Sequence, residues 1–107
     1  MELSTEKSEA MLRRIIDHYG HDAQKVKAIE ELSELIKELS KDLIGKGKLS
    51  NIAEEFADVK VMLGQLQIIY GFENDLIEAI QVEKILRTLE RSDLEKESVS
   101  SDMKKGD

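Results

Sequence analysis

The sequence predicts an all-α protein, a four-helix bundle that is completed by oligomerisation. Leu, Ile, Glu and Lys dominate the composition and proline is absent, which favours helices. Apolar residues recur at three- and four-residue steps in four successive segments, and no segment shows the alternation of a strand. The connections between these segments are short, which favours antiparallel neighbours. With 107 residues, 40% of them hydrophobic, the chain can build only a small core, so we expect some apolar surface to be buried between subunits.

The first helix is predicted over residues 5–18. Ser4 or Thr5 can supply its N-cap, because a short hydroxyl side chain accepts a hydrogen bond from the free N–H groups of the first turn. Gly20 permits the left-handed conformation that ends many helices. One face of the segment carries an apolar stripe formed by Met11, Leu12, Ile15, Ile16 and Tyr19.

The second helix is predicted over residues 22–44. Asp22 can cap it, and the sequence GKGK over residues 45–48 is the clearest break in the chain. Its apolar stripe, which centres near Leu32 and Leu39, consists of Val26, Ile29, Leu32, Ile36, Leu39 and Leu43. Such a stripe is typical of the face that a helix buries.

The third helix is predicted over residues 51–70. It begins with Asn51 and Glu54, which can form a reciprocal capping pair, and it ends at Gly71. From residue 61 to residue 70 it carries no charge. This half of the helix is therefore expected to be buried, either in the core or in a subunit interface.

The fourth helix is predicted to begin near Asn74 or Asp75. Its apolar stripe consists of Leu76, Ile77, Ile80, Ile85, Leu86 and Leu89. From Ser92 the sequence is polar, and we expect a disordered tail there. The predicted organisation is one all-α domain over residues 1–91, followed by a polar tail over residues 92–107.

The composition excludes several classes of partner. The formal net charge is −7, so the chain presents no overall positive field that would attract nucleic acid or an anionic membrane. Cysteine is absent, which excludes disulfides and Cys-ligated zinc and fits a reducing compartment. No apolar run approaches the ~20 residues of a membrane span, and the opening sequence MELSTEKSEA lacks the apolar segment of a signal peptide. We therefore expect a cytoplasmic protein with no nucleic-acid or membrane partner.

Two pairs of carboxylates are candidate metal ligands. Glu31 and Glu34 lie three residues apart on the second helix, and Glu55 and Asp58 do so on the third. Because each helical residue turns about 100°, the members of such a pair lie about 60° apart on one face. Four carboxylates brought together would repel one another, and a cation that prefers oxygen ligands, Mg²⁺ or Mn²⁺, would remove that repulsion. The competing interpretation is that these are solvated acids of a highly charged helical protein.

The order and spacing of these acids resemble the signature of a known family. EELSE over residues 30–34 fits the pattern EExxE, and EFAD over residues 55–58 fits ExxD, with 20 residues between them. This signature resembles that of the MazG-like all-α nucleoside triphosphate pyrophosphohydrolases. The flanking sequence is similar too, in AIEELSELIKEL over residues 28–39 and EEFADVKVMLGQLQIIYG over residues 54–71. The resemblance covers roughly residues 10–91.

The resemblance implies a fold, a reaction and a metal site. The fold would be a bundle of the all-α NTP pyrophosphatase type, assembled as a homodimer or homotetramer. The reaction would be hydrolysis of a (d)NTP between the α and β phosphorus atoms, giving (d)NMP and pyrophosphate; related enzymes prefer dUTP, dCTP or phosphoribosyl-ATP. The cofactor would be Mg²⁺, with Mn²⁺ as a substitute, and its ligands would be Glu31, Glu34, Glu55 and Asp58.

The remaining candidate residues would act on water and phosphate. Glu30, next to Glu31, is the first candidate to orient or deprotonate the attacking water, and Glu38 is the second. The candidate phosphate- or nucleotide-binding residues are Lys27, Lys46, Lys48, Lys84 and Arg87. The last two are the first choice, because the family often uses basic residues near the end of the last helix. The alternative for these cations is a solvated basic face that pairs with the many acids.

Two other functions stay open. The chain could be a non-catalytic helical interaction module whose third helix docks a partner. It could also be a family member that binds metal and nucleotide without turnover. The segment VEKILRTLER over residues 82–91 offers no clear polar residue for contact with a base or a ribose, which leaves the substrate open.

Overall fold

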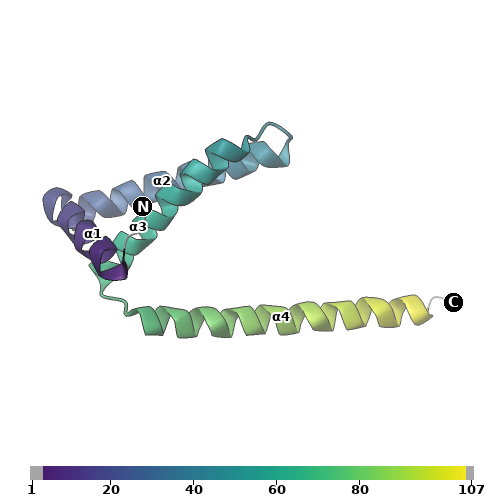
Figure 1. Ribbon diagram of the computed structural model, residues 1–107. Coiled ribbons are helices and arrows are strands. Elements are labelled where there is room, and N and C mark those ends of the chain that lie inside the picture. The colour runs from purple at the N-terminus through teal and green to yellow at the C-terminus, as the bar shows by residue number, and fades with distance from the viewer. Residues whose placement is uncertain (1–3, 106–107) are drawn as a thin grey trace. The chain divides into compact units, whose positions relative to one another are not determined.

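The protein is all-helical, as the sequence predicts. The computed structural model describes residues 4–105, with side chains for residues 4–99, and contains no strand in that part of the chain. Figure 1 shows its helices, which are α1 (Thr5–Tyr19), α2 (His21–Leu43), α3 (Leu49–Tyr70) and α4 (Asn74–Lys105). Over the described residues, none of these helices combines the length and the hydrophobicity that a transmembrane span requires.

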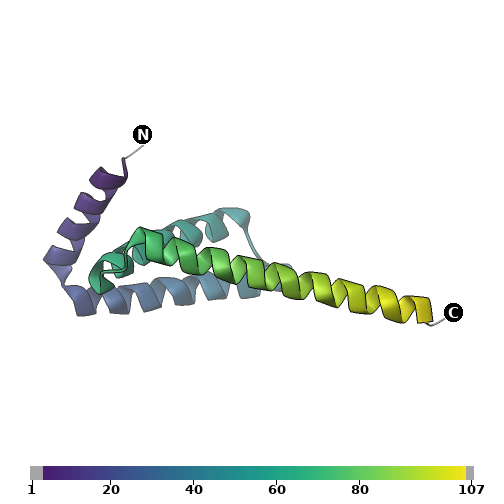
Figure 2. The same ribbon diagram turned by 90° about the horizontal axis from the view of Figure 1, so that it is seen from below.

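The chain divides into two compact units. The first extends to Gly71 and contains α1, α2 and α3; the second begins at Phe72 and contains α4. Within the first unit, α2 and α3 form an antiparallel hairpin joined by residues 44–48, and α1 packs against both helices (Figures 1 and 2). The contacts between helices that can build a site therefore come from the first unit, and the fourth helix of the predicted bundle belongs to the second.

Most helix ends follow the predicted signals. The hydroxyl oxygen of Ser4 accepts a hydrogen bond of 3.2 Å from the backbone N–H of Lys7, which caps α1. Gly20 has φ +94° between α1 and α2, and Gly71 has φ +69° in the left-handed region at the end of α3. Residues other than glycine rarely adopt these backbone angles, so both glycines fix the places where the helices end.

Two helix starts differ from the prediction. Helix α3 begins at Leu49, and its N-cap residue is Lys48, which makes no side-chain capping bond. Asn51 therefore lies inside the first turn, where its backbone N–H donates to the carbonyl oxygen of Lys48 at 3.1 Å. Helix α2 begins at His21 directly after Gly20, so Asp22 lies in its first turn rather than at its cap. In both cases the helix begins before the residue that is predicted to cap it.

Helix α4 is longer than the sequence predicts. It continues past Ser92 to Lys105, through most of the segment that we expected to be a disordered tail. The segment lacks an apolar stripe, but it contains neither proline nor glycine before Gly106, and its Leu, Glu and Lys residues are good helix formers. The last two residues of the predicted tail lie outside the described part of the chain.

Helix α2 packs on α3 with a face that does not carry its apolar stripe. Val26 and Ile36 are each 64% exposed and Leu43 is 88% exposed, although all three belong to the stripe expected to be buried. The buried residues of α2 and α3 are Gln24, Ala28, Glu38, Val59, Met62 and Gln65. On an ideal helix the apolar stripe of α2 is centred about 100° away from the buried residues of the same helix, Gln24, Ala28 and Glu38. The seam between α2 and α3 is therefore unusually polar.

Candidate acidic site

Three of the four predicted metal ligands meet in the seam between α2 and α3. Glu31 of α2 and Glu55 and Asp58 of α3 each offer one carboxylate oxygen, and these three oxygens lie within 4.8 Å of one another. We call these three residues the acidic cluster. Glu31 and Glu55 are half-buried and Asp58 is exposed at the edge of the seam. The cluster is thus open to solvent on one side, as a site for a hydrated ion and a substrate must be.

Glu34, the fourth predicted ligand, lies beside the cluster rather than within it. Because α2 and α3 are antiparallel, residues further toward the C-terminus of α2 lie opposite residues further toward the N-terminus of α3. Glu34 is three residues after Glu31, and Glu55 is three residues before Asp58, so this register brings Glu34 level with Glu55. The negative charge of Glu34 contributes to the raised pKa of Glu55, which places the two carboxylates within electrostatic range.

Two carboxylates of the cluster, Glu55 and Asp58, have pKa values raised above those of free carboxylic acids. Desolvation is the largest cause of the raised pKa of Glu55, and repulsion from Glu31, Asp58, Glu34 and Glu38 adds to it. Desolvation also raises the pKa of Asp58, together with the charge of Glu31 and a hydrogen bond to it, and Lys27 partly offsets this effect. A divalent cation relieves both causes at once, since it replaces lost hydration and cancels the repulsion.

Two buried carboxylate oxygens in or beside the cluster have no hydrogen-bond partner among the described residues. They are the Oε2 atoms of Glu38 and Glu55. Glu38 is 8% exposed, and its other oxygen lies 3.4 Å from the ammonium nitrogen of Lys41. A buried carboxylate oxygen without a donor is destabilising, and a cation is a chemically suitable partner for it. Together with the clustered oxygens of Glu31 and Asp58, the orphaned oxygen of Glu55 fits Mg²⁺ or Mn²⁺, which prefer hard oxygen ligands.

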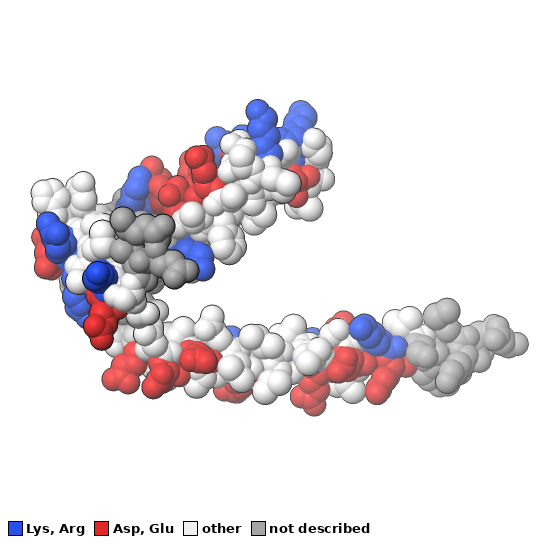
Figure 3. All heavy atoms as spheres, viewed as in Figure 1, with Lys and Arg blue, Asp and Glu red and all other residues white. Residues whose placement is uncertain are grey.

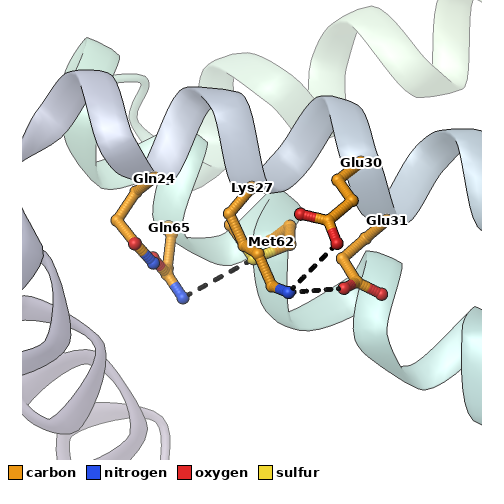
Figure 4. Close-up of polar contacts among 6 residues, drawn as sticks. All are labelled: Gln24, Lys27, Glu30, Glu31, Met62 and Gln65. Atoms are coloured by element: carbon orange, nitrogen blue, oxygen red, sulfur yellow. Dashed lines mark hydrogen bonds and ion pairs between the residues drawn. The ribbon is translucent and has the colours of Figure 1, made fainter.

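Lys27 already places one positive charge at the cluster. Its Nζ atom lies 3.1 Å from Oε1 of Glu31 and 3.7 Å from Oε1 of Glu30, as Figure 4 shows. The Glu31 side chain is 13% exposed, whereas that of Glu30 is 60% exposed. Glu30, the first candidate to act on water, therefore projects from the outer side of α2 and pairs with Lys27.

The other candidate cations are distributed over both units. Lys46 and Lys48 are exposed in the loop that joins α2 to α3, and Figure 3 shows basic atoms at that end of the hairpin with acidic atoms further back along it. Lys84 and Arg87 lie on α4, in the second unit, where Arg87 forms an ion pair of 2.8 Å with Glu83. The acidic cluster in the first unit is thus accompanied by Lys27, whereas Lys84 and Arg87 belong to a separate unit.

The same seam contains a buried amide pair that is not among the predicted site residues. Nε2 of Gln24 donates to Oε1 of Gln65 at 2.7 Å, and Nε2 of Gln65 lies 3.8 Å from the sulfur of Met62 (Figure 4). The sequence contains a signal for this pair, because Gln24 shares the flank of α2 that carries Glu31, and Gln65 shares a row of α3 with Asp58. Uncharged glutamine is common on solvated helices, so the sequence alone does not distinguish this pair from surface residues.

Comparison with known proteins adds no family assignment. The sequence matches no protein-family model, and neither the curated proteins nor the solved structures gave a match. The likeness to the MazG-like enzymes therefore rests on the acidic motifs and their flanking sequence, and the geometry of the seam between α2 and α3 is the independent observation beside it.

Proposed function

We propose that the chain is a Mg²⁺-dependent nucleoside triphosphate pyrophosphohydrolase that cleaves (d)NTP to (d)NMP and pyrophosphate. The observation that carries this proposal is the meeting of Glu31, from one helix, with Glu55 and Asp58 from its neighbour, within 4.8 Å. These are the acids that the family resemblance implies as ligands, and they converge across the structure although 20 residues separate their motifs. Glu34, one turn along α2, would complete the set.

The residues around the cluster would divide the chemistry between them. Glu31, Glu55 and Asp58 would hold the cation, which when bound neutralises phosphate oxygens and lowers the pKa of a coordinated water. Lys27 lies on the same side of α2 as Glu31 and would bind a phosphate oxygen through its ammonium group. Lys46 and Lys48, on an exposed loop, would supply further contacts to the triphosphate.

Two acids compete for the role of orienting the attacking water. Glu30 is adjacent to Glu31 but is exposed and paired with Lys27. Glu38 is buried and keeps one free carboxylate oxygen. The water hydrogen must reach an acceptor oxygen, and each candidate has one carboxylate oxygen outside its ion pair with a lysine. Turnover of Glu30→Gln and of Glu38→Gln separates them, because loss of the orienting acid lowers kcat by about a hundredfold or more.

The proposed oligomer draws support from the exposed apolar stripe of α2. Val26, Ile29 and Ile36 are each more than half exposed in one chain, and such a continuous apolar strip is typical of a surface that another helix covers. A second copy of the chain would cover it in the homodimer or homotetramer that the resemblance implies.

The proposal is tested with a panel of nucleoside and deoxynucleoside triphosphates in the presence of Mg²⁺. Pyrophosphate release is expected from at least one substrate, and Glu55→Gln is expected to lower it by about a hundredfold or more. The matched control is Glu54→Gln, an exposed acid next to Glu55 on the same helix, which should retain activity. Release of inorganic phosphate without pyrophosphate would contradict the proposed bond cleavage.

A non-catalytic interaction module is the second candidate, and the same exposed stripe of α2 favours it. It predicts that Mg²⁺ and Mn²⁺ leave the melting temperature unchanged, whereas a carboxylate site that binds metal is stabilised by it. A family member without turnover gives a third pattern, in which metal and nucleotide raise the melting temperature but no pyrophosphate appears.

A further inference from the structure

The Gln24–Gln65 pair joins the two helices that carry the acidic cluster. The two amides are 7% and 2% exposed, and their hydrogen bond spans 2.7 Å between α2 and α3 (Figure 4). Loss of this bond would leave two buried amides without partners, which is unfavourable. The pair therefore favours one axial offset between the helices over all others.

That offset is the one in which the acids meet. Glu31 lies seven residues after Gln24 on α2, and Asp58 lies seven residues before Gln65 on α3. Seven residues are close to two helical turns, so both acids return to the same side of their helices as the amides. Wherever Gln24 faces Gln65 in an antiparallel hairpin, Glu31 therefore faces Asp58.

Apolar packing specifies this offset poorly. The buried apolar residues of the seam are Ala28 of α2 with Val59 and Met62 of α3, while the apolar stripe of α2 is directed elsewhere. Without a strong apolar pattern, paired helices slip more easily, and a buried polar pair is a known means of fixing register. The loop over residues 44–48 restrains one end of the hairpin, and the amide pair lies near the other end.

We propose that Gln24 and Gln65 are positioning residues that hold α2 and α3 in the register required for Glu31, Glu55 and Asp58 to bind one cation. This inference rests on the proposed function for the cation itself. The role of the two glutamines is exerted through the acids, and they need not touch metal or substrate.

The test is the double variant Gln24→Met with Gln65→Met, which keeps the side-chain length and removes both amides. We expect its melting temperature without metal to stay the same or rise, because replacing both partners of a buried hydrogen bond leaves no orphaned group. We expect its affinity for Mn²⁺, measured by calorimetry, to fall by about tenfold or more. The matched control is Gln81→Met, an exposed glutamine of α4 that should change neither quantity.

A second readout reports the register without metal. The chain has no cysteine, so spin labels on Lys37→Cys and Lys60→Cys, both exposed, report the distance between α2 and α3. The labelled chain is diluted with an excess of unlabelled chain, so that only distances within one chain are recorded even in an oligomer. We expect one narrow distance distribution in the parent chain and a distribution broadened by about one turn, ~5 Å, in the double variant. The variant Gln24→Leu with Gln65→Leu repeats both measurements with a differently shaped pair.

The outcomes separate the inference from the function on which it rests. If the parent chain binds no Mn²⁺, the proposed function fails, and the spin-label distances alone decide the register. If the parent binds Mn²⁺ and both double variants bind it equally well with unchanged distances, the positioning role is overturned. It is also overturned if both double variants fail to fold, since the pair would then serve the fold as a whole.

Discussion

At Glu55, one carboxylate oxygen is buried without a hydrogen-bond partner, while Glu31 and Asp58 add negative charge close by. The uncharged half of α3 begins only a few residues later, so these acids stand where the helix enters its apolar part. The raised pKa values of Glu55 and Asp58 reflect the cost of desolvating these two carboxylates and of placing them beside other acids. Residue-level predictions follow from that cost and from the lysine that partly relieves it.

The first prediction concerns pH. The pKa of Glu55 is raised from its ordinary value of 4.5, and that of Asp58 from 3.8. The folded protein therefore binds these protons more readily than the unfolded chain. The contribution of the two groups to the free energy of unfolding is greatest at low pH and is lost as pH rises through the raised values. Melting temperatures in a metal chelator, measured from about pH 4 to about pH 8, should show this loss.

The matched control for the pH prediction is Glu55→Gln, which cannot ionise at that position. We expect its melting temperature to depend less on pH and to exceed that of the parent chain near neutral pH without metal. Added Mn²⁺ should reverse the order, because only the parent chain keeps all its ligands. A parent profile that rises with pH in the chelator would contradict the repulsion inferred for the cluster.

The second prediction concerns Lys27. Its ammonium group lies 3.1 Å from an oxygen of Glu31 and thus competes with a divalent cation for that ligand. Lys27→Met should therefore bind Mn²⁺ more tightly, by up to about fivefold, the range expected for a partly exposed ion pair. It should also bind a non-hydrolysable triphosphate more weakly, since a phosphate-binding cation is lost.

The direction of the change in Mn²⁺ affinity distinguishes competition by Lys27 from a general loss of stability. A destabilising substitution weakens metal binding, whereas removal of a competing cation strengthens it. Lys37→Met is the matched control, since it removes an exposed lysine elsewhere on α2. Weaker Mn²⁺ binding by Lys27→Met would show that the lysine supports the cluster instead of competing for it.

Helix α2 has two faces with different tasks, and this limits what its sequence predicts. The spacing of its apolar residues identifies a helix correctly, and the glycines at 20 and 71 mark helix ends that the structure confirms. The same spacing suggests that the stripe faces the core, whereas Ile36 and Leu43 are exposed and the buried face carries Gln24 and Glu38. Periodicity shows that a face is apolar, but not which neighbour covers it.

The candidate site was partly predictable for the same reason. Acids three residues apart must share a helix face, so the two pairs could be read from the sequence. Their convergence depends on the register between two helices, which short-range spacing does not encode. The sequence therefore does not show that Glu34 lies beside, rather than among, the three acids that meet. The end of α4 was missed because polar helix formers and a disordered tail have similar compositions.

At the level of the whole molecule, the first unit taken by itself leaves much apolar surface uncovered. Besides the stripe of α2, helix α1 carries a shallow groove of about 380 Å³, lined by Met11, Arg14, Ile15, His18 and Tyr19. Few large apolar side chains in the first unit are buried, and a small domain with so modest a core is marginally stable by itself. Association with a second copy would bury the stripe and add the missing stabilisation.

The third prediction is that Ile36→Glu combined with Leu39→Glu disrupts this association. Placing two carboxylates in an apolar interface should weaken self-association by more than about tenfold, because the charges would be buried without partners. Light scattering should then give the mass of one 12.2 kDa chain for the variant and a multiple of it for the parent. Ala23→Glu, an exposed position of α2 roughly 150° around the helix from Ile36 and Leu39, is the matched control.

A parent chain that is monomeric by light scattering, at the concentrations where it is active, would contradict this prediction. The apolar stripe would then be free for a different protein, as the interaction-module alternative requires. The acidic cluster would still lie wholly within one chain, because all its ligands come from α2 and α3.

Helix α2 carries its apolar stripe and its acids on different sides, and this separation has an evolutionary consequence. Substitutions along the apolar stripe of α2 can alter the proposed self-association while the acidic cluster is left unchanged. Conversely, substitutions among the acids can abolish or change the proposed reaction without disrupting the proposed assembly. Descendants of such a chain can therefore lose either trait and keep the other.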